Sequence, residues 1–70
     1  MAERRLGNRL KEHRARLHLT QADLAERVGV SRKTINTVEN GVFVPSTTLA
    51  LTLGRALEAR VEDLFFLIEE

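Results

Sequence analysis

The apolar residues of this chain recur three to four positions apart, which is the spacing of helices with one buried face. No segment shows the sustained alternation of apolar and polar residues that marks a half-buried strand. The pattern therefore predicts an all-α fold, a compact five-helix bundle. The expected helices cover about Leu6–Leu17, Gln21–Val28, a segment capped by Ser31 that runs to Glu39, Thr48–Leu57 and Val61–Leu67.

Residue types that start and stop helices lie at the ends of these segments. Thr20 precedes the second helix as an N-cap, and Asp23 stands where a capping box is completed. Gly29 ends that helix, because glycine readily takes a positive φ. Ser31 caps the third helix, and the Asn-Gly pair at 40–41 stops it.

The segment from Gln21 to Asn40 has the spacing of a helix-turn-helix. Two short helices joined by a turn of three or four residues cross at roughly 90–120°. The crossing requires a small residue where the helices meet and a glycine in the turn, and Ala25 and Gly29 supply these. The residues expected to anchor the turn and the third helix from beneath are Val30, Ile35 and Val38.

The opposite face of the third helix is polar, and it carries Ser31, Arg32, Lys33, Asn36 and Thr37. The major groove of B-DNA admits one α-helix, and Arg or Lys pairs well with the O6/N7 edge of guanine. The first residues of a recognition helix are those that reach base edges. This face therefore predicts sequence-specific binding of double-stranded DNA. The alternative is an ordinary solvated face of a small bundle, which the spacing of the buried positions disfavours.

The charge distribution adds to this picture, although the net charge is only +1. Residues 1–33 hold nine Lys or Arg residues and four acids, a net charge of +5. Residues 34–70 hold two basic residues and six acids, a net charge of −4. Such asymmetry suggests that one end of the domain faces a polyanion.

Length and composition argue against several classes of protein, namely metal-binding proteins, enzymes and membrane proteins. Seventy residues predict one domain over 1–70, with a core at about 6–67. There is no cysteine, and His13 and His18 are five residues apart, so we expect no metal and no cofactor. We find no pattern typical of a catalytic site or of a phosphate loop, so the chain is not expected to be an enzyme. With no membrane-length apolar run and no signal-peptide pattern, a cytoplasmic location is expected.

Several short segments match a known family in order and with the right gaps. They are LTQADLA at 19–25, VGVS at 28–31, TI at 34–35, ENG at 39–41, Pro45-Ser46, Leu57 and VEDLF at 61–65. Over residues 8–67 the chain thus resembles the Cro and lambda-type repressor family, also called the xenobiotic-response-element family. The resemblance implies a five-helix, all-α, lambda-repressor-like domain that binds operator DNA, usually as a homodimer. It also implies a transcriptional regulator, and we expect a repressor.

The resemblance assigns roles to individual residues. Arg32, Lys33 and Thr37 match base-reading positions, with Asn36 beside them. Gln21 matches a residue that contacts phosphate and supports the first recognition residue, and Asn40 matches another phosphate contact. To the phosphate contacts we add Ser31 and two basic residues of the first helix, Arg9 and Arg16.

Arg14 and Glu39 match a pair that forms a partly buried salt bridge in the family. Arg14 also falls on the apolar stripe of the first helix with Leu10 and Leu17, where an unpaired charge is costly. The alternative is an arginine whose stem is covered and whose head stays in water.

Two departures from the family concern the ends of helices. Glu58 stands where the family often has glycine, so we expect this junction to differ. The loop 42–44, Val-Phe-Val, lacks the basic residues of many relatives, and the alternative role of Phe43 and Val44 is as part of a dimer surface. The apolar tail predicts a homodimer interface, formed by Phe65, Phe66 and Ile68, although a loose hydrophobic end is the alternative.

Two other functions stay open. One is a protein-interaction module such as an antitoxin. The apolar tail and the acidic second half of the chain would suit the docking of a partner protein. The other is the DNA-binding part of a longer, ligand-responsive regulator.

Overall fold

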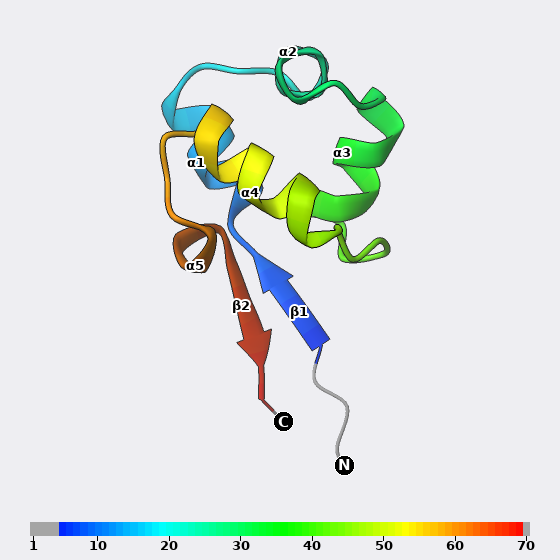
Figure 1. The fold of residues 1–70 in the computed structure, drawn as a ribbon, viewed down its shortest axis with the longest axis vertical. Helices are drawn as coiled ribbons and strands as arrows, with labels where there is room; N and C mark the ends of the chain where they lie inside the picture. Colours follow the sequence, from blue (N-terminus) through cyan, green and yellow to red (C-terminus); the bar gives the residue numbers. More distant parts are fainter. Residues whose placement is uncertain (1–4, 70) are drawn as a thin grey trace.

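The computed structural model describes residues 5–69 and contains five helices and one small sheet. Figure 1 shows the helices gathered into one body, from which a ribbon of two strands projects towards the chain ends. In chain order the elements are β1 (Arg5–Asn8), α1 (Leu10–Arg16), α2 (Gln21–Val28), α3 (Arg32–Glu39), α4 (Thr47–Ala56), α5 (Val61–Leu64) and β2 (Phe65–Ile68).

The two strands correct the sequence-based prediction at both ends of the domain. β1 and β2 pair antiparallel, with Leu6 opposite Leu67 and Gly7 opposite Phe66. The fold is therefore mostly helical but not all-α, and the first and fifth helices are shorter than expected. Each strand has only four residues, so no alternation of period two could develop, and a short apolar run does not distinguish strand from helix.

The ribbon is held by one close packing contact. Gly7 is buried because the ring of Phe66 lies directly over it, and a β-carbon at position 7 would collide with that ring. The guanidinium of Arg9 lies over the same ring, 4.6 Å from its centre. Beyond the strands, the Arg9 amide donates to the carbonyl of Leu64, so the pairing continues to the start of α1.

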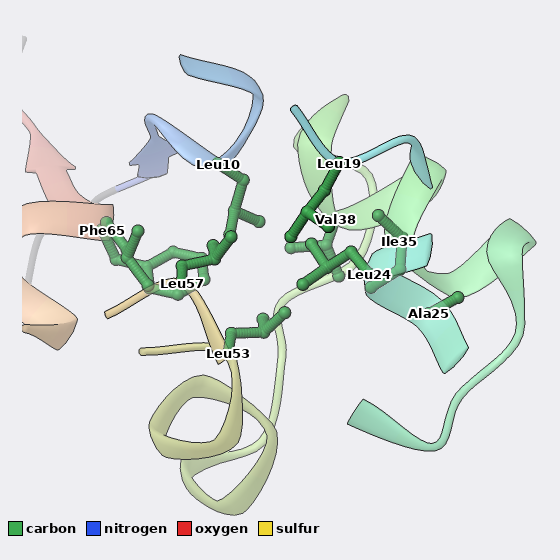
Figure 2. Close-up of a cluster of buried hydrophobic side chains, with 10 residues drawn as sticks. Leu10, Leu19, Leu24, Ala25, Ile35, Val38, Leu53, Leu57 and Phe65 are labelled. Atoms are coloured by element: carbon green, nitrogen blue, oxygen red, sulfur yellow. The ribbon is translucent and has the colours of Figure 1, made fainter. Parts of the chain in front are cut away.

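The core takes one leucine or isoleucine from every helix. The five side chains are fully buried and come from α1 to α5 in turn: Leu10, Leu24, Ile35, Leu53 and Leu64. Figure 2 shows most of the cluster, with Phe65 of β2 beside Leu57. Because every helix gives a side chain to one cluster, no helix can shift without exposing apolar surface.

The helix ends follow the predicted capping residues. The Thr20 hydroxyl accepts a hydrogen bond from the Asp23 amide at 3.0 Å, and the Asp23 carboxylate accepts one from the Thr20 amide at 2.9 Å. The latter bond to the charged form lowers the pKa of Asp23. Gly29 ends α2 at a φ of 77°, as predicted. Ser31 caps α3 as predicted, and Ser46 caps α4 in the same way.

The junction between α4 and α5 differs from the expectation. Glu58 itself adopts the left-handed conformation, with a φ of 54°, so the glycine-like turn is kept without glycine. The prediction that this junction would change is therefore wrong. The turn folds back on α4, because the Ala59 amide donates to the carbonyl of Gly54 at 2.9 Å.

This turn makes Gly54 a position where alanine should destabilise the protein. In an open helix, Gly→Ala raises stability by about 1 kcal/mol. Here a β-carbon would stand 2.8 Å from the carbonyl oxygen of Ala59, a backbone atom. We expect Gly54→Ala to lower the free energy of unfolding by about 1–3 kcal/mol, as overpacking does, measured by urea denaturation.

The control is Thr48→Ala, at an exposed position of the same helix, where only a small gain from helix propensity is expected. If both alanines stabilise the protein, the close approach at Gly54 does not constrain the fold.

Candidate nucleic-acid interface

α2 and α3 form the predicted helix-turn-helix. They lie together at the end of the body opposite the strands (Figure 1). The amides of Gly29 and Val30 both donate to the carbonyl of Ala25, at 2.9 and 3.0 Å, and this closes the turn. Ala25 is only 4% exposed, so the small side chain does lie where the helices meet. Ile35 and Val38 are buried beneath α3, as predicted.

The outer face of α3 presents three polar side chains. Arg32, Lys33 and Asn36 are all exposed, and with Gln21 of α2 they line a shallow hollow of about 360 Å³. The structure therefore brings together four of the predicted DNA-contacting residues. Arg32 and Lys33 stand in the first turn of α3 and Gln21 at the start of α2, beside the capped ends of these helices, and Asn36 follows one turn later in α3.

The two hydroxyl residues of α3 are already engaged in the helix. The Ser31 hydroxyl accepts from the Thr34 amide at 3.1 Å, and the Thr37 hydroxyl donates to the carbonyl of Thr34 at 2.9 Å. Thr37 is also half-buried. Either oxygen can still accept a bond, but the Thr37 proton is used within the helix.

Arg14 and Glu39 form the predicted salt bridge between α1 and α3. Arg14 Nε donates to Glu39 Oε2 at 2.8 Å and Nη2 donates to Oε1 at 3.1 Å, while Nη1 donates to the carbonyl of Leu19 at 2.9 Å. The side chains are only 14% and 6% exposed. The hydrogen bond to the carboxylate raises the pKa of Arg14 above its ordinary value, and burial opposes this only in part. The guanidinium is therefore paired rather than held in water.

Gln21 extends this pair to the outer face of α3. Its Nε2 donates to Glu39 Oε1 at 3.1 Å and to Asn36 Oδ1 at 3.2 Å. Within the described chain no hydrogen bond joins Gln21 to Arg32, the recognition residue that the resemblance led us to expect. Gln21 holds the middle of the recognition helix instead of its start.

Asn8 is a positioning residue that the sequence reasoning missed. Its Nδ2 donates to the carbonyls of Val38 and Glu39, at 3.0 and 3.3 Å, and its Oδ1 accepts from the Leu10 amide at 3.1 Å. One side chain thus satisfies the end of α3 and the start of α1. An asparagine two residues before a helix was the available signal, and it was obscured because the predicted helix began at Leu6.

The other predicted phosphate contacts are dispersed. Arg16 is exposed in the last turn of α1, and Asn40 is the exposed C-cap of α3. Arg9 lies over Phe66 of the ribbon and does not line the hollow on α3. The structure therefore does not bring these three residues to the hollow itself.

The residues of the predicted dimer surface differ in exposure. Phe65 is 8% exposed and belongs to the core, so a single chain presents little of its side chain to a partner. Successive side chains of a strand face opposite sides, which is why Phe66 is 37% exposed. Ile68 is half-buried. Leu67, which the prediction omitted, is 55% exposed.

The described residues contain neither a metal-binding cluster nor a membrane-spanning helix. Among residues 5–69, no group of three His, Asp or Glu side chains could hold a metal ion. Within the same range, no helix is long and apolar enough to cross a membrane.

Comparison with known proteins places this geometry in a family. A family model described as a helix-turn-helix domain matches residues 5–65, which is most of the chain. The chain belongs to this helix-turn-helix family. The prediction drawn from the spacing between Gln21 and Asn40 is thereby confirmed.

Helix-turn-helix proteins named as transcriptional regulators are similar over nearly their whole length. An uncharacterized HTH-type regulator of Archaeoglobus fulgidus is 47% identical over 62 residues, covering 89% of this chain and 87% of that protein. The regulator YgzD of Bacillus subtilis is 46% identical over 63 residues, covering 90% and 96%. A regulator of Methanothermobacter thermautotrophicus is 50% identical over 62 residues, covering 87% and 90%.

A solved structure has the same helix-turn-helix fold. The restriction-modification controller protein C.AhdI from Aeromonas hydrophila superimposes with a TM-score of 0.73 at 31% identity. The similarity covers 77% of this chain and 82% of that one. The predicted resemblance to small helix-turn-helix regulators is confirmed at the level of fold and family.

The salt bridge of this helix-turn-helix domain leads to a stability prediction. Arg14→Met would leave the nearly buried carboxylate of Glu39 without its charged partner. We expect the free energy of unfolding to fall by about 3 kcal/mol, because breaking a buried ion pair leaves an uncompensated charge. Urea denaturation measures the loss. Arg16→Met, at an exposed position of the same helix, should change stability by no more than about 0.5 kcal/mol. Equal losses in the two variants would contradict the structural role of the pair.

Proposed function

We propose that this protein is a transcriptional regulator that binds a specific sequence of double-stranded DNA by inserting α3 into the major groove. The observation that carries the proposal is the outer face of α3, where Arg32, Lys33 and Asn36 are exposed together on a helix fixed from beneath. The resemblance to lambda-type repressors supports repression as the outcome of binding.

The charge distribution also favours an orientation in which α1, α2 and the start of α3 face the DNA. The basic half of the chain, residues 1–33, includes α1, α2 and the first two residues of α3. Phosphate contacts from Gln21, Ser31, Asn40 and the arginines of α1 would hold the domain and set its register, while side chains in the groove read the bases. Affinity should then fall linearly with salt on a logarithmic scale.

Arg32→Ala tests base reading. After in vitro selection of bound duplexes, we expect this variant to lose about 1–3 kcal/mol on the preferred site and to relax preference at one base pair. Arg55→Ala removes an exposed arginine from the last turn of α4 and should leave the preference unchanged. Binding of random and selected duplexes with equal affinity at every salt concentration would refute a sequence-specific regulator.

We further propose that the protein acts as a homodimer. Two recognition helices related by two-fold symmetry would reach successive major grooves, about 34–36 Å apart. An exposed apolar surface is available on α4, where Leu51 is 59% exposed at the rim of a hollow of about 270 Å³. The hollow is lined by Leu6, Pro45, Thr47, Ala50, Leu51, Val61 and Phe65. Leu67 of the ribbon is a further exposed apolar side chain.

Leu51→Glu tests the homodimer. Light scattering should give twice the 7.9 kDa of one chain for the wild type and a smaller mass for the variant. The variant should also bind a two-half-site duplex with the affinity of a single half-site. Thr48→Glu places the same charge at an exposed position on α4 and is the control. A wild type that is monomeric both free and on DNA would contradict the proposal.

A second candidate function is the binding of a partner protein. It is favoured by the loop Val42–Val44, whose three side chains are exposed by 78%, 46% and 67%. The loop backbone is anchored, because the amides of Val42 and Phe43 both donate to the carbonyl of Thr37. Co-purification of an untagged protein, without any shift of DNA at low salt, would favour this function over DNA binding.

A further inference from the structure

A single chain of hydrogen bonds runs from the interior of the domain to the surface of the recognition helix. It passes from Arg14 to Glu39, then to Gln21, and ends at Asn36. Burial decreases along it, from the salt bridge at 14% and 6% exposure, through the half-buried Gln21, to the exposed Asn36. Each member constrains the orientation of the next.

The donor and acceptor chemistry fixes which end of each amide faces its neighbour in this series of hydrogen bonds. A carboxylate only accepts hydrogen bonds, and both oxygens of Glu39 already accept from Arg14. The amide of Gln21 must therefore face Glu39 with its NH2 group. That NH2 group has a second proton, which points to the side chain of Asn36 at 3.2 Å. Only the carbonyl oxygen of Asn36 can accept it.

The amide of Asn36 is consequently fixed with its oxygen towards α2. Its NH2 group, with two donors, is left for the outer face of α3. A free asparagine reads adenine with both ends of its amide, accepting from N6 and donating to N7. The bond from Gln21 uses one lone pair of the Asn36 oxygen and turns that oxygen towards α2, so the amide faces the groove with its NH2 end rather than with both ends.

The neighbours of Asn36 in the hollow have the same polarity. Arg32 and Lys33 carry donors and no acceptor. The exposed side chains that α3 offers in the hollow are therefore all hydrogen-bond donors. In the major groove such a surface matches the carbonyl edges of guanine and thymine rather than the amino groups of cytosine and adenine.

We propose that Asn36 determines specificity as a donor to a base carbonyl, and that Gln21 is the positioning residue that gives it this polarity. The proposal rests on the proposed function, because it concerns the same recognition helix. It differs from the role that the resemblance implies for Gln21, which is support of the first recognition residue.

The test begins with in vitro selection of duplexes by the wild type and by Asn36→Ala. The base pair whose preference disappears in Asn36→Ala lies under this side chain. Asn36→Asp keeps an oxygen for Gln21 and replaces the outward donors by an acceptor. Reversal of a base pair exchanges carbonyl and amino groups at a given place in the groove. We expect Asn36→Asp to prefer the reversed pair, with a change in preference of roughly tenfold or more.

Gln21→Ala tests the positioning role. It should relax preference at the same base pair as Asn36→Ala, and the double variant should relax it no further. The readout is the ratio of affinities for the two orientations of that pair, which a loss of phosphate contact or of stability would leave unchanged. Lys33→Ala is the matched control, and it should relax a different base pair.

The outcomes separate the two proposals. If the wild type selects no sequence, the proposed function fails. If it selects a site but Asn36→Asp retains the wild-type orientation, or Gln21→Ala and Asn36→Ala relax different base pairs, the inference about polarity is overturned.

Discussion

The pairing of Arg14 with Glu39 is the interaction on which the rest of the recognition surface depends. Two nearly buried charges are stable only when each satisfies the other and the remaining hydrogen bonds are filled. Here the guanidinium uses its third contact on the carbonyl of Leu19, at the entry to α2, and the carboxylate uses its remaining capacity on Gln21. One ion pair therefore connects α1, the entry to α2, α2 itself and α3.

The small sheet holds the same helices from the other side. Pairing of β1 with β2 brings Asn8 to the C-terminal end of α3, where its amide donates to the carbonyls of Val38 and Glu39. Burial of Gly7 beneath Phe66 fixes the register of the ribbon. The recognition helix is thus held at its C-terminal end by the ribbon and along its inner face by the core.

Much of the candidate site could be predicted from local features. Capping residues, the turn glycine and the buried positions of α2 and α3 act within a few residues of each other, so their spacing is visible in the sequence. Exposure of Arg32, Lys33 and Asn36 follows from the same periodicity, since Ile35 and Val38 occupy the opposite face. The direction of the Asn36 amide could not be predicted, because it depends on contacts between residues far apart in the sequence. Gln21 and Asn36 are 15 positions apart, and Arg14 and Glu39 are 25 positions apart.

The sequence by itself determined the presence of five helices, the caps of α2 and α3 and the helix-turn-helix, because helical periodicity and capping are local properties. Only the tertiary structure decided the β1–β2 ribbon, since its pairing joins the two ends of the chain and four-residue strands carry too little pattern. The same is true of Phe65, whose place in the core follows from strand geometry rather than from a helical stripe. It is also true of Glu58, which takes a left-handed conformation because the turn onto Gly54 requires it.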